Sequence, residues 1–467
     1  MLPDNRAKSV LIGFLSLAAL IAAGCSSMSN SLSGAQSADT GQAFVIGTDA
    51  PAAAVVSFNV QIDSIEAVNS KTNASAALLS GKPVVDFARF NGLQTLLDLN
   101  DVAAGTYDTV VITLDQSSSD TIGYLDTSTT EPTVKTTPAT LNNTKITIPL
   151  QSALVIAKSI SMGLRVDFNL RQSIQTDSSG QINGQVNPTF NVKVVKPGDS
   201  GGHVDELVGG VVSVDQTNQQ FVIQGPHGRQ LTVKISGTTD WDDNSNLSEL
   251  NTSTVVEISG VLDNAESTID ADEVAILTQD KFFASGQITY VTPASGAASS
   301  FDLYLRSLEP TNTGLTLGQL ATVKLSGAEN YYIYWMRNPM TQFLFNSSAL
   351  VAGQDVAIGG PASGAADATN VTTKRVVLRP WGFVGTVVPG SINTAQGTFE
   401  LKVDGFAGVL IPTPVTVFIG GATDYRDGLS AESDITASAR IRVVGLLLKN
   451  PTSGQVVLLA RHVDGLN

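Results

Sequence analysis

Cysteine and histidine are scarce in this chain, which removes several kinds of site from consideration. Cys25 is the only cysteine among 467 residues, so an internal disulfide and a multi-thiolate zinc site are both excluded. The three histidines, His203, His227 and His462, fall in a glycine-rich linker, a Gly-Pro-His-Gly turn and the C-terminal end. A Gly-X-Ser-X-Gly sequence occurs once, at residues 198–202, but it lies in the glycine-rich linker and lacks the strand-turn-helix context of the serine hydrolase motif. We therefore expect no catalytic triad, no cofactor and no enzymatic activity.

Charge is sparse as well, and it is mostly negative. Charged residues make up 15% of the chain, and 42 Asp and Glu against 27 Lys and Arg give a net charge of −15. This balance is unfavourable for binding nucleic acid, which is not expected as a partner. Beyond the N-terminal segment, no apolar run approaches the roughly 20 residues that a membrane-spanning helix needs.

The single cysteine ends a segment typical of exported proteins. Arg6 and Lys8 precede an apolar run, residues 10–23, which is too short to span a bilayer as a mature helix. The run leads into Ala22-Ala23-Gly24-Cys25, which resembles the lipobox of bacterial lipoproteins. The resemblance implies cleavage after residue 24 and lipid attachment at Cys25, so that the membrane becomes a partner through the anchor. An ordinary signal peptide with an incidental cysteine is the alternative.

The residues after the cysteine indicate where the protein is held. Residues 25–42 are small and polar, too poor in apolar surface to fold, and predict a flexible tether. Ser26 occupies the place where lipoproteins retained at the inner membrane often carry Asp. The resemblance therefore implies an outer-membrane lipid anchor, and the periplasmic and the surface-exposed side both stay open.

The body of the chain has the pattern of β-structure. Between residues 56 and 62 apolar and polar side chains alternate, as in a strand with one buried face. Similar alternations recur between turn-forming segments and predict a β-sandwich over residues 43–197. Within it, Leu93, Leu96 and Leu97 have the spacing of one short helical turn.

Four motifs follow one another in this stretch and carry a family resemblance. They are Thr48-Asp49-Ala50-Pro51, Leu99-Asn100-Asp101-Val102-Ala103-Ala104-Gly105-Thr106-Tyr107, Leu164-Arg165-Val166-Asp167-Phe168 and Asn187-Pro188-Thr189-Phe190. Together they resemble the domain of unknown function 4382 family of bacterial lipoproteins over about residues 43–195. The resemblance implies location and architecture but no chemistry. We interpret the residues of these motifs as structural: Pro51 and Gly105 shape turns, and Tyr107 buries its ring at the start of a strand.

The remainder is an internal repeat. A segment that begins Thr-Val occurs three times, at residues 232–241, 322–331 and 416–425. A glycine opens the first strand of each copy, at Gly210, Gly286 and Gly385. The pattern resembles the domain of unknown function 5666 family over about residues 206–464. It predicts three six-stranded, barrel-like domains at 206–280, 282–379 and 380–465, and hence an all-β chain with an N-terminal sandwich.

One acidic turn has partial metal-binding character. Asp240, Asp242 and Asn244 alternate as oxygen ligands do in a calcium loop. The bending glycine and the distal glutamate of such a loop are missing, and the other two copies lack the spacing. We interpret the segment as a polar turn and expect no metal, with calcium as the alternative.

One aromatic segment is the candidate binding surface. Tyr331, Tyr332, Tyr334 and Trp335 lie within five positions of a chain that is 6% aromatic. Period two would bury Tyr332 and Tyr334 in the second barrel and direct Tyr331, Ile333 and Trp335 to the opposite face. Core packing, contact with a neighbouring domain and a ligand site are the three alternatives.

These observations predict a non-catalytic, lipid-anchored envelope protein that presents β domains for binding, adhesion or envelope organisation. Its partner is an unidentified protein or glycan. The alternative is a glycan-directed hydrolase with carboxylates at a site between domains, which requires two carboxylates about 5–9 Å apart in a cleft. Calcium-stabilised adhesion is a third possibility.

Overall fold

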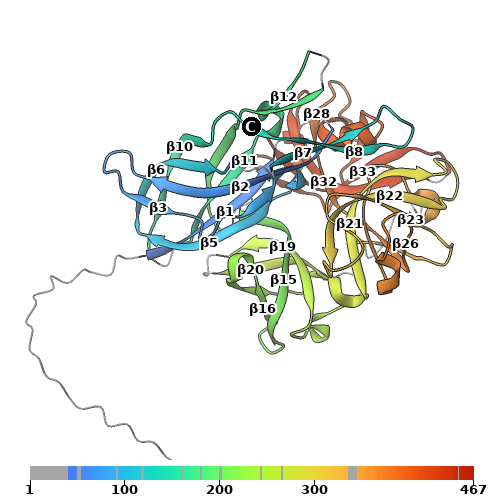
Figure 1. Cartoon of the computed structure of the whole chain (residues 1–467), viewed down its shortest axis with the longest axis horizontal. Coiled ribbons are helices and arrows are strands. Elements are labelled where there is room, and N and C mark those ends of the chain that lie inside the picture. The colour runs from blue at the N-terminus through green and yellow to red at the C-terminus, as the bar shows by residue number, and fades with distance from the viewer. Residues whose placement is uncertain are drawn as a thin grey trace, which may run out of the picture. The chain divides into compact units, whose positions relative to one another are not determined.

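Strands make up nearly all of the regular structure, which confirms the predicted all-β class (Figure 1). The computed structural model describes residues 40–49, 54–90, 93–116, 120–158, 161–178, 181–198, 202–241, 245–263, 267–334, 344–450 and 452–466. All of these residues lie in the compact unit Asp39–Asn467. None of the helices in these ranges combines the length and the apolar character needed to cross a membrane.

The N-terminal domain is a sandwich of two main sheets. Its strands are β1 Thr40–Asp49, β2 Val55–Val68, β3 Ser75–Ala77, β4 Val84–Asp86, β5 Thr95–Ala103, β6 Gly105–Leu114, β7 Thr121–Asp126, β8 Thr133–Pro138, β9 Thr140–Leu141, β10 Lys145–Ile156, β11 Met162–Phe168, β12 Ile174–Thr176, β13 Ile182–Val186 and β14 Phe190–Val195. A 3-10 helix, Phe87–Phe90, and the one-turn α1, Leu170–Ser173, interrupt them.

The two sheets enclose an apolar core. One has the order β14-β11-β1-β5, and the other β10-β6-β2-β7-β8, with β3 and β4 beside β2; a small third sheet joins β12, β13 and β9. Along β2 buried and half-buried residues alternate, because successive side chains of a strand point to opposite faces. Phe58, Phe87, Phe168 and Phe190 form a chain of touching rings at the centre.

Two local predictions in this domain have different outcomes. Tyr107 is buried as expected, and its hydroxyl donates a hydrogen bond to the Ala103 carbonyl at 2.8 Å. The helical turn predicted from Leu93, Leu96 and Leu97 is wrong, because Leu96 and Leu97 belong to β5, where Leu96 pairs with Ile46 of β1. Pairing with a neighbouring strand overrides the local spacing of these leucines.

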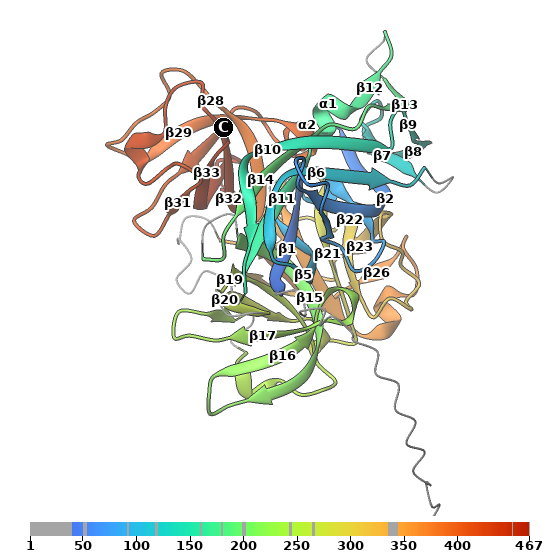
Figure 2. The same cartoon turned by 90° about the vertical axis from the view of Figure 1, so that its left-hand side faces the viewer.

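The first and third repeats are closed five-stranded barrels (Figure 2). The first consists of β15 His203–Asp215, β16 Gln220–Gln224, β17 Gln230–Lys234, β18 Asp240–Trp241, β19 Val255–Leu262 and β20 Thr268–Ile276. The third consists of β28 Trp381–Val387, β29 Thr398–Val403, α2 Gly405–Leu410, β30 Val415–Phe418, β31 Asp424–Arg426, β32 Arg440–Lys449 and β33 Val456–Gly465. In the first barrel the last strand, β20, pairs antiparallel with β19 and parallel with β17. In the third barrel the last strand, β33, pairs antiparallel with β32 and parallel with β30. The parallel pairing closes each barrel. This strand order is that of an OB-fold barrel, and the additional short strand, β18 or β31, lies beside the last one.

The second repeat follows the same path with a divided last strand. Its strands are β21 Phe282–Thr292, β22 Ser300–Glu309, β23 Leu320–Lys324, β24 Asn330–Ile333, β25 Asp355–Gly360, β26 Val371–Thr372 and β27 Arg375–Arg379. β26 pairs with β23, and β27 pairs with β25. These two segments together make the pairings that a single last strand makes in the other repeats. The break lies at Thr373, whose hydroxyl donates to the carbonyls of Gly359 at 2.9 Å and Arg375 at 2.7 Å.

A glycine in the first strand of each repeat marks a close crossing of two strands. A Cβ atom there would collide with a backbone carbonyl of the second strand, at Gly209 with Gln224, at Gly286 with Tyr304 and at Gly385 with Lys402. The sequence predicted Gly210 for this position in the first copy. However, Gly209 is the residue whose pairing with the fourth barrel strand matches that of Gly286 and Gly385. Gly210 has open space around its Cα instead.

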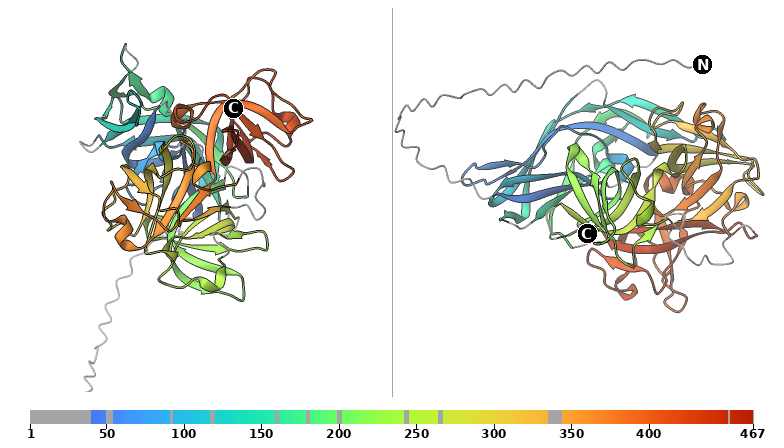
Figure 3. Two further views of the ribbon diagram at one scale, coloured as in Figure 1. Left: turned by 90° about the vertical axis from the view of Figure 1, so that its right-hand side faces the viewer. Right: turned by 90° about the horizontal axis from the view of Figure 1, so that it is seen from below.

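Neighbouring domains, whose ribbons are drawn in Figure 3, share parts of their side-chain cores. Phe44 and Ile46 of β1 pack into the core of the first repeat. Leu446 and Leu448 of β32 contribute to the core of the second repeat, and Leu93 to that of the third. Burying this apolar surface between domains stabilises the way they pack together.

Candidate functional site

A cleft between the N-terminal domain and the third repeat contains two cavities, of about 740 and 540 Å³. We call them the larger and the smaller cavity. Both fall in the size range of small-molecule sites. Arg171 of α1 lines both, so the cavities meet at this side chain.

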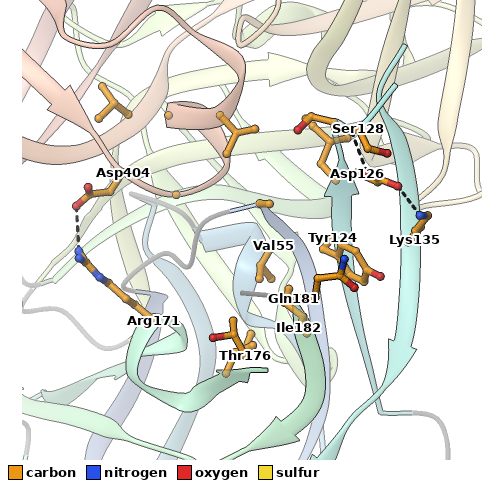
Figure 4. Close-up of a pocket in the computed structure, with 18 residues that line it drawn as sticks. Val55, Tyr124, Asp126, Ser128, Lys135, Arg171, Thr176, Gln181, Ile182 and Asp404 are labelled. Atoms are coloured by element: carbon orange, nitrogen blue, oxygen red, sulfur yellow. Dashed lines mark hydrogen bonds and ion pairs between the residues drawn. The ribbon is translucent and has the colours of Figure 1, made fainter. Parts of the chain in front are cut away.

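The larger cavity combines one aromatic ring with polar side chains (Figure 4). Tyr124 of β7 lies beside Gln181 and Ile182, between two ion pairs at opposite sides of the view. One is Asp126 with Lys135, and the hydrogen bond from this lysine lowers the pKa of Asp126 to about 2. The wall opposite the N-terminal domain comes from β29 and α2 of the third repeat.

A triad of charged groups separates the two cavities. Asp404 Oδ2 accepts hydrogen bonds from Arg171 Nη1 at 3.3 Å and from Arg440 Nη1 at 2.7 Å. Asn169 caps α1 by accepting a hydrogen bond from the Gln172 amide, which fixes the turn that carries Arg171. One carboxylate therefore serves two guanidinium groups, one from each domain.

The smaller cavity is built on the outer face of the sheet β14-β11-β1. Thr48 pairs with Asp167, Asp167 with Asn191, and Arg165 with Lys193 across the three strands. Period two directs these side chains away from the sandwich core, where Leu164, Val166 and Phe168 are buried. The third repeat adds Val384, Arg440, Arg442, Gly465 and Leu466.

Asp49, at the end of β1, is the most perturbed group of the smaller cavity. Its side chain is buried, and Oδ1 accepts one long hydrogen bond, 3.4 Å, from the Leu170 amide. Oδ2 has no hydrogen-bond partner within the part of the chain that the structure describes. Burial, and next the negative charge of Asp167, raise the pKa of Asp49 well above its usual value. Asp167 itself accepts a hydrogen bond from Asn191 Nδ2 at 3.1 Å.

Comparison with known proteins identifies the domain that carries most of this cleft. Residues 40–186 match the model of a family described as "Domain of unknown function (DUF4382)". The match covers the sandwich up to β13 and ends before β14. The resemblance predicted for this stretch is thereby confirmed, and we call it the DUF4382-like domain. No curated protein matches the chain.

One solved structure among the matches is described as "drosophila Unr CSD456". It is 12% identical and aligns over 56% of this chain and 97% of its own. Its TM-score is 0.14, which is too low to support any conclusion about fold or function.

Sequence reasoning missed the cavity residues of the DUF4382-like domain. Asp49, Arg165 and Asp167 all lie in the motifs that carried the family resemblance, and those motifs were interpreted as structural. The available signal was the alternation of charged with apolar residues in Leu164-Arg165-Val166-Asp167-Phe168, which places charge on one face of a strand.

A second buried polar cluster adjoins the smaller cavity. The rings of His203 on β15 and His462 on β33 are 5.9 Å apart, and both are buried. His203 Nε2 lies 2.9 Å from Asp205 Oδ1, and Arg442 Nε donates to Asp464 Oδ2 at 2.5 Å. Because Arg442 lines the cavity, this cluster forms part of its inner support.

The two histidines were expected in unrelated places, a linker and the C-terminal end. The structure instead makes His203 the first residue of β15 and brings it to His462. A sequence signal existed, because His-Val-Asp occurs twice, at residues 203–205 and 462–464.

The predicted acidic turn and lipid site can be placed only in part. Asp240 opens β18 and pairs with Glu273 of β20. Asp242, Asn244 and Cys25 lie outside the described residues. Among the residues that are described, no three His, Cys, Asp or Glu side chains gather as a metal site would require.

The candidate aromatic surface has a different arrangement from the one expected. Tyr331 and Ile333 pack against the core of their own barrel, Tyr332 is 40% exposed, and Tyr334 is buried beside the first repeat. The expected faces were thus wrong, because the pairing of β24 with β27 turns Tyr331 and Ile333 inward. Trp335 lies outside the described residues, so the surface stays a prediction.

Tyr334 belongs to a buried ionic junction between the first two repeats. The Arg379 guanidinium lies 5.9 Å from the Tyr334 ring centre and pairs with Glu257 of β19 and, at 3.4 Å, with Glu206 of β15. Burial raises the pKa of Glu257 to about 7, and that of Asp355 is also well above its usual value. Such a junction fixes the relative orientation of the repeats.

Proposed function

We propose that this protein is a lipid-anchored, non-catalytic protein of the bacterial outer membrane that binds a glycan in the cleft. Its C-terminal repeats would be members of the domain of unknown function 5666 family. Anchoring follows from the lipobox-like segment ending in Cys25, and binding from the chemistry of the two cavities.

The observation that carries the proposal is the composition of the connected cavities. Tyr124 offers an aromatic face, which is the apolar surface that a sugar ring stacks against. Thr176, Gln181, Asn191 and Asp126 offer hydroxyl, amide and carboxylate groups for sugar hydroxyls. Two cavities that meet at Arg171 suit an extended ligand with several units better than one compact molecule.

Binding can be tested on an array of bacterial envelope glycans with the full-length protein in detergent. Tyr124→Ala should weaken retention of the bound glycan about 30-fold, because a central aromatic contact contributes roughly 2 kcal/mol. Tyr290→Ala is the matched control, since Tyr290 is half-buried and lines neither cavity. Equal retention by wild type and Tyr124→Ala, or no retained glycan at all, would contradict the proposal.

Anchoring is tested by fractionation. Cys25→Ser removes the acylation site and should shift the protein from the detergent-extracted membranes to the soluble fraction. Recovery of this variant with the membranes at the wild-type level would contradict the lipid anchor.

One observation favours glycan hydrolysis as the second candidate. Asp49 carries a raised pKa and lines the same cavity as Asp167, and glycosidases use two carboxyl groups of which the acid has a raised pKa. Incubating the protein with a bound glycan distinguishes the two functions. New reducing ends that disappear in Asp49→Asn would establish hydrolysis, and an intact glycan would leave binding alone.

A further inference from the structure

The smaller cavity is rich in cations, although the chain as a whole carries a net charge of −15. Its positively charged lining residues are Arg165, Arg171, Lys193, Arg440 and Arg442. Only Asp49 and Asp167 line it as acids. A concentration of positive charge in an acidic protein raises the local concentration of anions.

Not all of these cations are neutralised by the protein. Arg165 pairs with Asp427 at 2.9 Å and Arg442 with Asp464 at 2.5 Å, so these two are balanced. Arg171 and Arg440 share the single carboxylate of Asp404. Lys193 forms no ion pair within the described ranges and is exposed on β14. The cavity therefore holds unbalanced positive charge at Arg171, Arg440 and Lys193.

The acids of the cavity cancel only part of this excess, because Asp167 adds a single negative charge. Asp49 retains its proton to a higher pH than an ordinary carboxyl, because it is buried and next to Asp167. While it holds this proton, the Asp49 carboxyl is a hydrogen-bond donor beside the lysine and the arginines. The lining of the cavity therefore favours a ligand group whose oxygens are negatively charged and accept hydrogen bonds.

We propose that the smaller cavity binds the carboxylate of an acidic sugar, so that the glycan held in the cleft is a uronic-acid-type polymer. This inference rests on the proposed glycan-binding function and names its substrate class. The planar guanidinium groups of Arg171 and Arg440 match a carboxylate in geometry, and each can donate two parallel hydrogen bonds. Asn169, Gln172 and Asn191 surround them with amides that suit sugar hydroxyls. The neighbouring sugar units then extend past Arg171 into the larger cavity.

The test uses oligogalacturonate and its fully methyl-esterified form, two probes with the same sugar backbone in which each carboxylate is either free or replaced by a neutral methyl ester. Calorimetric titration of the full-length protein in detergent should give at least tenfold tighter binding of the free acid. Lys193→Gln should weaken binding of the free acid about tenfold, because hydrogen bonds between charged groups are stronger than those between neutral groups. The affinity for the methyl ester should not change in this variant.

Lys145→Gln is the matched control, because Lys145 is an exposed lysine of the same sandwich that lines neither cavity. It should bind both probes as the wild type does. Inorganic phosphate is added as a competitor to separate a carboxylate site from a general anion site, and 10 mM should not displace the acidic oligomer.

The outcomes separate this inference from the function on which it rests. Equal binding of acid and ester, or an unchanged affinity in Lys193→Gln, overturns the acidic-sugar inference and leaves glycan binding in place. Displacement by phosphate also overturns it and assigns the cavity to phosphate-bearing ligands. If neither oligomer nor any array glycan binds, the proposed function fails as well.

Discussion

At the scale of single residues, burial changes the protonation of several groups in opposite directions. His462 is 3% exposed, and burial, followed by the charges of Arg426 and His203, holds its pKa well below the usual 6.5. Asp49 and Asp355 show the converse, with pKa values raised mainly by burial. Each group is therefore favoured in its neutral form by the folded chain.

The histidine gives a pH dependence with a defined sign. Below pH 6.5 the unfolded chain protonates His462 while the folded chain does not, so stability falls as the pH decreases. We expect this group to cost up to about 1.4 kcal/mol at one pH unit below that value. His462→Gln should be less destabilised than wild type between pH 7 and pH 5.5, as measured by thermal unfolding. An identical loss in both proteins would show that another group is responsible.

For the site residues, the sequence shows only which side chains of a single strand share a face. The alternation around Arg165 and Asp167 indicates that both point to one face, but it does not reveal what covers that face. Arg440 and Arg442, which complete the cavity, come from the last repeat, and only the folded chain brings them there. His203 and His462 are separated in the same way, and only the repeated His-Val-Asp connects them in the sequence.

At the scale of elements, the repeats were predictable because each copy must rebuild the same barrel. The Thr-Val segment becomes the third barrel strand each time. The tenth residue of each segment, Trp241, Tyr331 or Tyr425, packs against the core of its own repeat. The division of the last strand of the second repeat was not predictable, because it depends on hydrogen bonds that Thr373 makes across the sheet.

The close crossing at Gly209 yields a test with an internal control. A Cβ atom at Gly209 would lie 2.8 Å from the Gln224 carbonyl oxygen, whereas one at Gly210 would meet nothing within 4 Å. Gly209→Ala should therefore destabilise the protein by about 1–3 kcal/mol, the usual range for overpacking. Gly210→Ala should be close to neutral in chemical denaturation. The reverse order would mean that Gly210 has the register of Gly286 and Gly385.

At the scale of the whole molecule, the domains are joined by shared apolar cores and by buried charge. Phe44 and Ile46 extend the first repeat's core into the DUF4382-like domain. Arg306 is held among the rings of Tyr304, Trp381 and Phe406, which come from the second and third repeats. These junctions could not be predicted, because a charged residue in a β-strand gives no sequence signal of its partner in another domain.

The Arg379 junction should respond to mutation in a manner that depends on pH. Removing this guanidinium leaves Glu257, Glu206 and Asp355 together without their buried cation. Breaking a buried ion pair by removing one partner costs about 3–5 kcal/mol, and we expect this loss for Arg379→Ala at pH 8. At pH 5 the loss should be smaller, because the pKa of Glu257 is already about 7 and it is then neutral.

Val377→Ala separates the electrostatic effect from simple loss of packing. Val377 is buried in the same junction, and its truncation should cost about 2 kcal/mol equally at both pH values. Denaturant unfolding followed by tryptophan fluorescence measures all three proteins, since Trp381 is buried near the junction strand β27 in sequence. If Arg379→Ala loses the same stability at pH 5 and pH 8, the arginine acts there through its packing, and its charge does not hold the first two repeats together.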